Sequence, residues 1–314
     1  MNGNAKSKKA DFSFPQALKS FLGYLEGTGK SVHTIKNYKL DLQSFKNYLE
    51  GSFLTKPAVL NELTSQDLEG FHTFLKNLGL KTNTRRRMLM TVRKFFQYLN
   101  QRNKLSMDVG RRLVTPHKLE RIPLTISADD LLSAIRKLPE ETHLDLRNKL
   151  ILWILTETAC LVSEVSSLRY EQFNLENAEN PKLTFVTKSG SRTLNISPDL
   201  VSVLSKLQAR AGGAVHLFLG FNKFGALGAP ISPRGIEMLV KHLAPKLGFK
   251  ILTPRTFRHS TIVHWLKHGV EQKEIQTRLG LKSQYAFRAY QTFAKKTKPT
   301  TKTTSTSGTN PPES

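Results

Sequence analysis

The chain has 314 residues, with 48 Lys and Arg against 24 Asp and Glu, which gives a formal net charge of +24 at pH 7. Its length predicts about two domains of roughly 100–200 residues each, and a hydrophobic content of 39% excludes a wholly disordered basic protein. The charge favours a nucleic acid as partner, because neutralising phosphates releases their counterions, although a basic ribosome-associated or membrane-surface protein stays open.

The cysteine content and the length of the apolar runs predict where in the cell the protein resides. Cys160 is the only cysteine, which excludes an intrachain disulfide framework and a zinc site built from several cysteines. The longest apolar run, residues 150–155, is far shorter than the roughly 20 residues that cross a bilayer, and no apolar signal segment follows the polar N-terminus. We therefore expect a soluble cytoplasmic protein with no metal, no cofactor, no membrane partner and no small-molecule substrate.

The first half of the chain predicts a helical domain over residues 12–106, after a disordered N-terminus at residues 1–11. Apolar residues three and four apart indicate amphipathic helices, and Ser31 and Thr64 stand where two of them would begin. The expected helices cover residues 14–25, 32–49, 65–78 and 84–99. We interpret this zone as a four-helix module.

A larger second domain is expected over residues 127–293, after a basic linker at residues 107–126 that holds two prolines. Its patterns are mostly helical, but residues 183–196 alternate as two strands around a loop at residues 188–191. Residues 294–314 carry Lys, Thr, Ser and Pro without a large apolar residue, which predicts a disordered tail. The expected fold class is mainly α with a small β-hairpin or sheet, in two domains.

The excess charge gathers between Lys76 and Arg121, where 13 basic residues face only Asp108 and Glu120. A solvated face is the usual outcome for a run of charge. An excess this large without acidic residues between favours a surface that contacts DNA. The residues expected on that surface are Arg85, Arg86, Arg87, Arg93, Lys94, Arg111, Arg112, Lys118 and Arg121.

Several short motifs stand in a fixed order along the chain. The first domain holds Ser31-x-x-Thr34-x-x-x-Tyr38-x-x-Asp41-Leu42 and, further on, Thr84-x-Arg86 and Arg93-x-Phe95-Phe96-x-Tyr98-Leu99. The second holds Thr158-Ala-Cys-Leu-Val-Ser163-Glu164, Thr187-Lys188-Ser-Gly, Thr253-Pro-Arg-Thr-Phe-Arg258-His259 and Leu279-Gly280-Leu281-Lys-Ser, with Tyr290 nine residues beyond Leu281. In order and spacing these motifs resemble the tyrosine recombinase (phage integrase) family, and in particular its Xer-like bacterial members.

This resemblance implies site-specific DNA recombination or integration, in which strands are cut and rejoined through a 3′-phosphotyrosine. Such chemistry needs a tyrosine nucleophile, arginines that stabilise the charge on the phosphate oxygens, a lysine that protonates the leaving oxygen, and a histidine that moves the tyrosine's proton. The resemblance implies that Tyr290 is the nucleophile, Arg258 the second family arginine and Lys188 the hairpin lysine. A packing tyrosine and an exposed turn lysine are the plainer alternatives.

Three positions depart from the family pattern. Leu161 replaces the first family arginine, Arg255 replaces the histidine that opens the His-x-x-Arg motif, and Leu281 replaces the histidine after Leu-Gly. Leucine can neither bind a phosphate nor move a proton, whereas Arg255 keeps a cation and could form a phosphate clamp with Arg258. His259 could substitute as an acid or base, but we expect a structural role for it.

Two functions stay open for a chain with these departures. One is a recombinase with weak or lost cleavage; the alternative is a catalytically inactive DNA-binding regulator or accessory factor derived from a recombinase. A nucleic-acid-binding protein unrelated to recombinases would explain the charge but not the ordered motifs. We expect double-stranded DNA as the partner and association with the nucleoid, and self-association on DNA stays open, because no apolar docking segment follows Tyr290.

Overall fold

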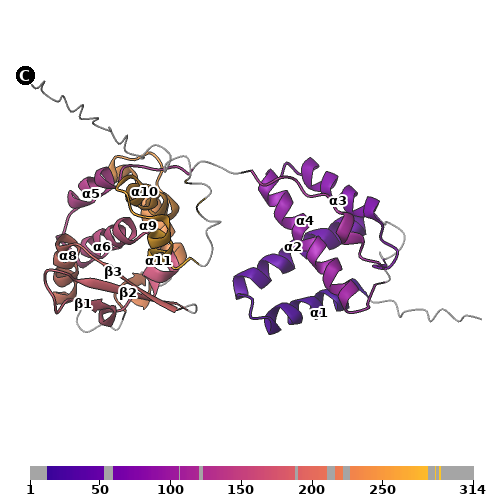
Figure 1. Ribbon diagram of the computed structural model, residues 1–314, viewed down its shortest axis with the longest axis horizontal. Helices are drawn as coiled ribbons and strands as arrows, with labels where there is room; N and C mark the ends of the chain where they lie inside the picture. Colours follow the sequence, from indigo (N-terminus) through magenta and orange to yellow (C-terminus); the bar gives the residue numbers. More distant parts are fainter. Residues whose placement is uncertain are drawn as a thin grey trace, which may run out of the picture. The chain divides into compact units, whose positions relative to one another are not determined.

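The computed structural model of the protein describes residues 13–52, 59–105, 107–119, 123–187, 190–210, 216–221, 227–281, 287 and 290. The chain divides into two compact units, residues 1–120 and 121–314 (Figure 1). Over these described ranges no helix has the length and apolar character needed to cross a membrane. The same ranges hold no group of three or more His, Cys, Asp or Glu side chains that could bind a metal ion.

The first unit contains the four helices expected from the apolar periodicity. They are α1 (Phe14–Gly27), α2 (Val32–Ser52), α3 (Ser65–Asn77) and α4 (Thr82–Gln101). A capping box begins α3: the Asp67 carboxylate accepts from the Thr64 N–H at 2.7 Å, and the Thr64 hydroxyl accepts from the Asp67 N–H at 3.3 Å. The predicted four-helix module is therefore confirmed for this unit.

Aromatic side chains from all four helices build the core of the first unit. Phe45 of α2 contacts Phe71 of α3 and Phe96 of α4, with ring centroids 5.0 and 6.0 Å apart in edge-to-face geometry. Phe21 of α1 meets Phe95 of α4 at 5.5 Å in the same way. All five rings are fully buried. Such pairs are each worth about 0.5–1.5 kcal/mol beyond their area burial, so the helices pack around one specified core.

Part of the predicted linker packs against α4. After the short 3₁₀ helix η1 (Val109–Arg112), Leu113 is buried, and Arg86 donates to the Pro116 carbonyl at 2.6 Å. The close approach depends on Gly110, because a Cβ there would lie 2.9 Å from the Phe96 Cβ. Residues 109–119 therefore belong to the first unit, and residues 120–122 lie outside the described part of the chain.

The second unit packs most of its helices around α6. Its α-helices are α5 (Ala128–Arg136), α6 (His143–Thr158), α7 (Val162–Ser166), α8 (Pro198–Ala209), α9 (Pro233–Leu243), α10 (Pro254–Lys267) and α11 (Gln272–Arg278). Short 3₁₀ turns occur at η2 (Tyr170–Gln172) and η3 (Pro245–Leu247). The apolar run at residues 150–155 is buried on all sides within α6, which lies in the middle of the unit (Figure 1). This run is thus a core helix.

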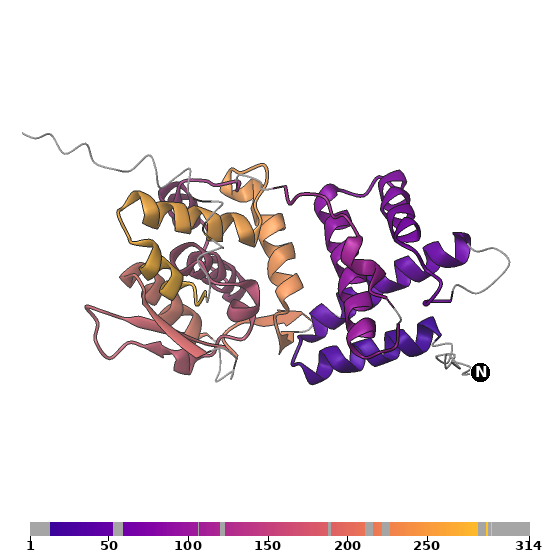
Figure 2. The same cartoon turned by 45° about the vertical axis from the view of Figure 1, so that its right-hand side comes forward.

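A three-stranded antiparallel sheet lies at one end of the second unit. Its order is β1 (Phe173–Asn174), β2 (Lys182–Thr187), β3 (Gly190–Asn195), and a separate pair is formed by β4 (Leu219–Phe221) and β5 (Leu227–Pro230). Leu183 pairs with Leu194, and Phe185 with Arg192. The predicted strand pair is confirmed, and its hairpin lies beside α11 (Figures 1 and 2).

A small apolar cluster, separate from the main core of the second unit, is formed by α10, α11 and the last described residues of the chain. Ile262 and Trp265 of α10, Ile275 of α11 and Phe287 form part of it, together with the ring of Tyr290. This cluster brings Tyr290 to the side of α10, 31 residues from His259 in sequence.

Candidate active site

The start of α10 positions the central cations of the site. The Thr253 hydroxyl accepts from the Thr256 N–H at 3.1 Å, and Pro254 occupies the first turn, where its missing N–H costs nothing. Arg255 follows in that turn with an exposed side chain, and Arg258 lies three residues on, half-buried. Residues three apart share a helix face, so both guanidinium groups lie on the same side of α10.

Arg258 is anchored to the end of α6. Its Nη1 donates to the carbonyl of Ala159, the residue that ends α6 with a left-handed φ of 50°. Burial lowers the pKa of Arg258 from its ordinary value, against the negative charge of nearby Glu164. The bond holds one nitrogen of the guanidinium, which carries further N–H groups of the kind that bind an anion.

Tyr290 and His259 form a hydrogen-bonded pair between the phenolic oxygen and Nδ1. Tyr290 is only 6% exposed, and burial raises its pKa to about 12, against the charges of Arg258 and Arg255. Burial, with the charges of Arg255 and Arg258, lowers the pKa of His259 to about 4. Near pH 7 the pair therefore consists of a neutral phenol and a neutral imidazole.

Leu161 lies at the N-terminus of α7, with half of its side chain exposed. Its N–H donates to Oε2 of Glu164 at 2.7 Å, so this carboxylate caps the helix. The side chain itself offers no donor, although it lies on the same cleft as Arg255 and Arg258. Leu161 therefore lies where an anion in the cleft could approach it, but its side chain has no group that could bind one.

Arg192 and Glu164 form a buried ion pair that motif spacing did not reveal. Nη1 and Nη2 of Arg192 donate to the two oxygens of Glu164 at 2.5 and 2.8 Å, and Nε donates to the Arg278 carbonyl at 2.8 Å. The two side chains are only 8% and 9% exposed. This contact ties β3, α7 and the end of α11 together. Arg192 directs Nε and both terminal nitrogens at these partners, so its guanidinium is held in the interior by Glu164 and the Arg278 carbonyl.

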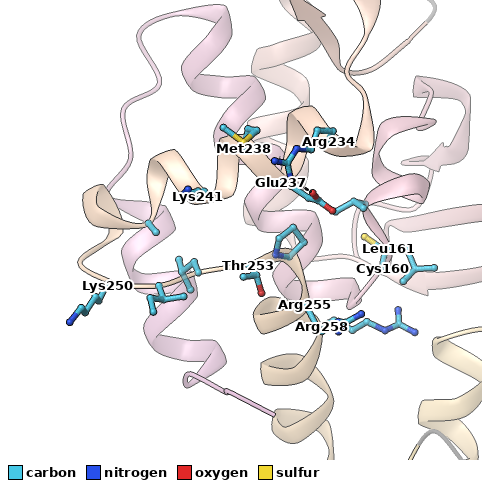
Figure 3. A pocket seen from close by; sticks show the side chains of 15 residues that line it. Cys160, Leu161, Arg234, Glu237, Met238, Lys241, Lys250, Thr253, Arg255 and Arg258 are labelled. Atoms are coloured by element: carbon cyan, nitrogen blue, oxygen red, sulfur yellow. Dashed lines mark hydrogen bonds and ion pairs between the residues drawn. The ribbon is translucent and has the colours of Figure 1, made fainter. Parts of the chain in front are cut away.

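A cleft of about 720 Å³ runs along the site between α9 and the start of α10. Figure 3 shows Arg255 and Arg258 extending from α10 toward the end where Leu161 lies. Three further cations and exposed apolar side chains line it. These residues are Arg234, Lys241 and Lys250, with Met238 and Ile251. The cleft thus offers positive charge for an anionic ligand and apolar surface beside it.

The other two predicted site positions are Leu281, which the structure describes, and Lys188, which it does not. Leu281 is half-buried against the cluster around Tyr290, and its carbonyl accepts from Gln276 Nε2 at 3.0 Å. Lys188 lies outside the described residues, so its place in the site stays a prediction. The structure thus brings together Tyr290, Arg258 and Arg255, with Leu161 on the same cleft.

The predicted DNA-contacting residues of the first unit divide into two groups. Arg87 pairs with the buried Asp41 at 2.5 Å, while Arg86 and Arg93 donate to carbonyls of residues 113–116. Lys94 lies over the Tyr38 ring at 5.6 Å, and Arg85 donates to Thr82 Oγ1 at 3.3 Å. The remaining described members are exposed; they are Arg111, Arg112 and Lys118. Arg121 lies outside the described residues.

Some of these cations therefore stabilise the first unit as well as charging its surface. A groove of about 570 Å³ between α2 and α4 is lined by Arg87, Arg93 and Lys94. Burial raises the pKa of Asp41 above its ordinary value, while the charge of Arg87 and the hydroxyl of Thr91 act in the opposite direction. Within this groove a carboxylate thus offsets part of the positive charge.

Comparison with known proteins assigns the family. Residues 18–103 match the phage integrase N-terminal SAM-like domain, and residues 126–297 match the phage integrase family. The chain is 28% identical over 273 residues to tyrosine recombinase XerD of Listeria monocytogenes, covering 84% of this chain and 89% of that protein. It is 25% identical over 269 residues to tyrosine recombinase XerC of Xanthomonas campestris, covering 84% and 80%.

Solved structures show the same fold. XerH site-specific recombinase bound to palindromic difH substrate, in a post-cleavage complex, matches with a TM-score of 0.71 and 18% identity over 90% of this chain and 82% of that chain. A lambda integrase tetramer bound to a Holliday junction matches with a TM-score of 0.65 and 14% identity, covering 90% and 83%. Together with the two domain matches, the fold and the ordered motifs place this chain in the phage integrase family of tyrosine recombinases.

Proposed function

We propose that this chain binds duplex DNA and cleaves a strand through Tyr290, at a rate that its substituted site makes low. The observation that carries the proposal is that the charges of Arg255 and Arg258 act on the phenol of Tyr290, while the two arginines also line a basic cleft. Relatives XerD and XerC are tyrosine recombinases. We assign DNA binding to residues 12–106 and cleavage to residues 127–293, in a protein that acts on DNA in the cytoplasm.

In the proposed reaction the phenolic oxygen of Tyr290 attacks a backbone phosphorus and displaces the 5′ oxygen, leaving a 3′-phosphotyrosine. Arg258 and Arg255 bind the non-bridging oxygens, where negative charge develops. Lys188 protonates the departing 5′ oxygen. The bond energy is retained in the phosphotyrosine, so a 5′ hydroxyl can reverse the step and rejoin a strand.

The low rate follows from the substituted positions. Removing one donor that binds transition-state charge costs on the order of 10²–10³ in rate in other enzymes. Leu161 removes such a donor, and Leu281 removes a side chain that could move a proton. Groups of one catalytic set act non-additively, so Arg255 restores part of the lost charge but does not restore the family geometry.

DNA binding does not depend on these positions. The exposed Arg111, Arg112 and Lys118 carry charge on the first unit, and the cleft of the second unit carries Arg234, Lys241 and Lys250. Neutralising phosphates with these cations releases counterions whatever the state of the catalytic set. Structures of relatives bound to DNA include a tetramer, so we also propose that this chain self-associates on DNA.

A second function is favoured by the environment of two side chains. Leu161 presents an exposed apolar side chain on the cleft that Met238 and Ile251 also line, and the Tyr290 hydroxyl is buried and already bonded to His259. Both features fit a chain that binds DNA as a regulator or accessory factor without cutting it.

The two functions are separated by a covalent-adduct assay. The substrate is a duplex selected for binding to the full chain from a random-sequence pool, with a nick that lets the cleaved fragment diffuse away. Slow formation of a denaturation-resistant protein–DNA species, absent in Tyr290→Phe, supports cleavage. Tyr290→Phe should retain its gel-shift affinity. A parent chain that binds this duplex but never forms the adduct would establish the non-cleaving function.

A further inference from the structure

The site has no histidine at either position where the family resemblance expects one. Arg255 stays protonated in proteins, and Leu281 has no polar side-chain atom, so neither can take a proton from Tyr290. A phenol whose burial raises its pKa to about 12 is a poor nucleophile until its proton leaves. The proposed cleavage therefore requires another acceptor within hydrogen-bond reach of the phenolic oxygen.

Among the residues that the structure describes, His259 is the one whose side chain forms a hydrogen bond with the phenolic oxygen of Tyr290. Its Nδ1 meets the Tyr290 hydroxyl, and the two ring centroids lie 5.5 Å apart with planes tilted by 50°. His259 lies in α10 directly after Arg258, whose guanidinium is fixed to the Ala159 carbonyl. The same turn of helix thus holds an anion-binding arginine and the imidazole that contacts the nucleophile.

We propose that His259 accepts the phenolic proton of Tyr290 on Nδ1 as the tyrosine oxygen attacks the phosphorus. This inference rests on the proposed cleavage function. The O–P bond forms as the O–H proton passes to Nδ1, and the P–O5′ bond breaks as the 5′ oxygen takes a proton from Lys188. His259 must then carry its own hydrogen on Nε2, so that the Nδ1 lone pair points at the hydroxyl.

Charge around the pair links this step to DNA binding. Burial is the largest cause of the lowered pKa of His259, and the charges of Arg255 and Arg258, both on α10, add to it. The phenol of Tyr290 faces the imidazole. Glu164 and Arg192 act on Arg258 in turn. Both arginines oppose a positive charge on the imidazole. A phosphodiester bound to them offsets their charge, so His259 becomes a better proton acceptor when the scissile phosphate is in place.

A first test reads the hydrogen bond without requiring cleavage. Nitrogen NMR of the full chain with ¹⁵N-labelled histidine distinguishes a bare ring nitrogen from a protonated one, and the signals absent in His259→Asn identify this residue. We expect a bare Nδ1 at neutral pH whose signal shifts in Tyr290→Phe. A protonated Nδ1 would overturn the proposal, because the imidazole would then donate to the phenolic oxygen.

A second test separates proton removal from leaving-group protonation. The nicked, selected duplex is prepared with an ordinary 5′ oxygen or with a bridging 5′ sulfur, which leaves without a proton. His259→Asn keeps a polar group near Nδ1 but cannot take up a proton, so its adduct formation should fall about 10²-fold or more on both substrates. Lys188→Ala should lose activity only on the oxygen substrate, and the matched control His264→Asn, on the same helix, should match the parent chain.

The outcomes distinguish this inference from the function on which it rests. An adduct formed by His259→Asn at the parent rate would refute the role of His259 and leave the cleavage function standing. Recovery of His259→Asn by the sulfur substrate would also refute it, because that result assigns His259 to the leaving group. No adduct from the parent chain on either substrate would refute the cleavage function and this step with it.

Discussion

Replacing Arg192 by methionine removes one partner of the buried ion pair with Glu164 and is expected to destabilise the second unit. Both partners are less than a tenth exposed, and the carboxylate receives two guanidinium hydrogen bonds, at 2.5 and 2.8 Å. In Arg192→Met the carboxylate loses both guanidinium hydrogen bonds and keeps the Leu161 N–H at 2.7 Å and the charge of nearby Arg258. The variant therefore leaves a charge in the interior with most of its compensation removed.

The expected loss can be worked from this geometry. Removing one partner of a buried pair costs about 3–5 kcal/mol in other proteins. For a unit of roughly 150–250 residues, each kcal/mol lowers the melting temperature by about 2–4 °C, so Arg192→Met should lower it by about 6–20 °C. Arg234→Met is the matched control, because its pair with Glu237 is 76% and 47% exposed. An exposed pair is worth about 0–1 kcal/mol.

The assay is thermal and urea unfolding followed by circular dichroism, with a double variant included. Arg192→Met/Glu164→Gln should be more stable than Arg192→Met alone, because the neutral amide costs less to bury and its oxygen still accepts from Leu161. If Arg192→Met unfolds within about 1 kcal/mol of the parent, or if the double variant is the less stable of the two, the account of a buried, uncompensated charge is wrong.

Three further predictions concern packing, DNA binding and pH. Gly110→Ala should destabilise the first unit by about 1–3 kcal/mol in urea unfolding, because the added Cβ would lie 2.9 Å from a side-chain carbon of α4; an unchanged midpoint would contradict the close packing. Arg111→Ala and Arg112→Ala should each reduce the slope of log affinity against log salt by about 1 without loss of stability, whereas Arg86→Ala should also lower stability, since it loses a 2.6 Å hydrogen bond to a carbonyl. Equal slopes in all three variants and the parent would argue against DNA contact there. Burial alone would raise the pKa of Glu164, but the hydrogen bonds from Arg192 and the Leu161 N–H lower it below the ordinary 4.5. The ionised carboxylate therefore stabilises the fold above about that pH, and this contribution is lost as the pH falls through the lowered pKa. Glu164→Gln should flatten the loss of stability at acid pH in unfolding experiments, and an unaltered loss would exclude Glu164 as its source.

The spacing of apolar residues along the sequence was sufficient to predict many of the helices and strands. The four helices of the first unit follow from apolar residues three and four apart, and the strand pair follows from alternation that buries Leu183, Phe185 and Leu194. The spacing of apolar residues follows from which side chains are buried, so it identifies helices and strands that pack one face on a core. The strands β4 and β5 were not predicted because they span only residues 219–221 and 227–230, which is too short for such a spacing to show.

Contacts between distant residues could not be read in this way. The Arg192–Glu164 pair joins residues 28 apart, and His259 meets Tyr290 across 31 residues. Nothing in the local sequence of Arg86 distinguishes an arginine that bonds a backbone carbonyl from one that faces solvent. The packing of residues 109–119 on α4 was missed for a related reason, since prolines and low periodicity also describe a segment held by hydrogen bonds from its neighbour.

The most direct test of the account compares adduct formation by the parent chain with that of the variant Leu161→Arg, Arg255→His and Leu281→His combined. If these three positions limit the proposed cleavage while DNA binding is retained, the combined variant should form the Tyr290 adduct on a nicked, selected duplex at least about 10²–10³-fold faster than the parent chain. Its gel-shift affinity should stay within a few fold of the parent. A correctly folded combined variant that binds equally well and forms no more adduct than the parent would contradict the account.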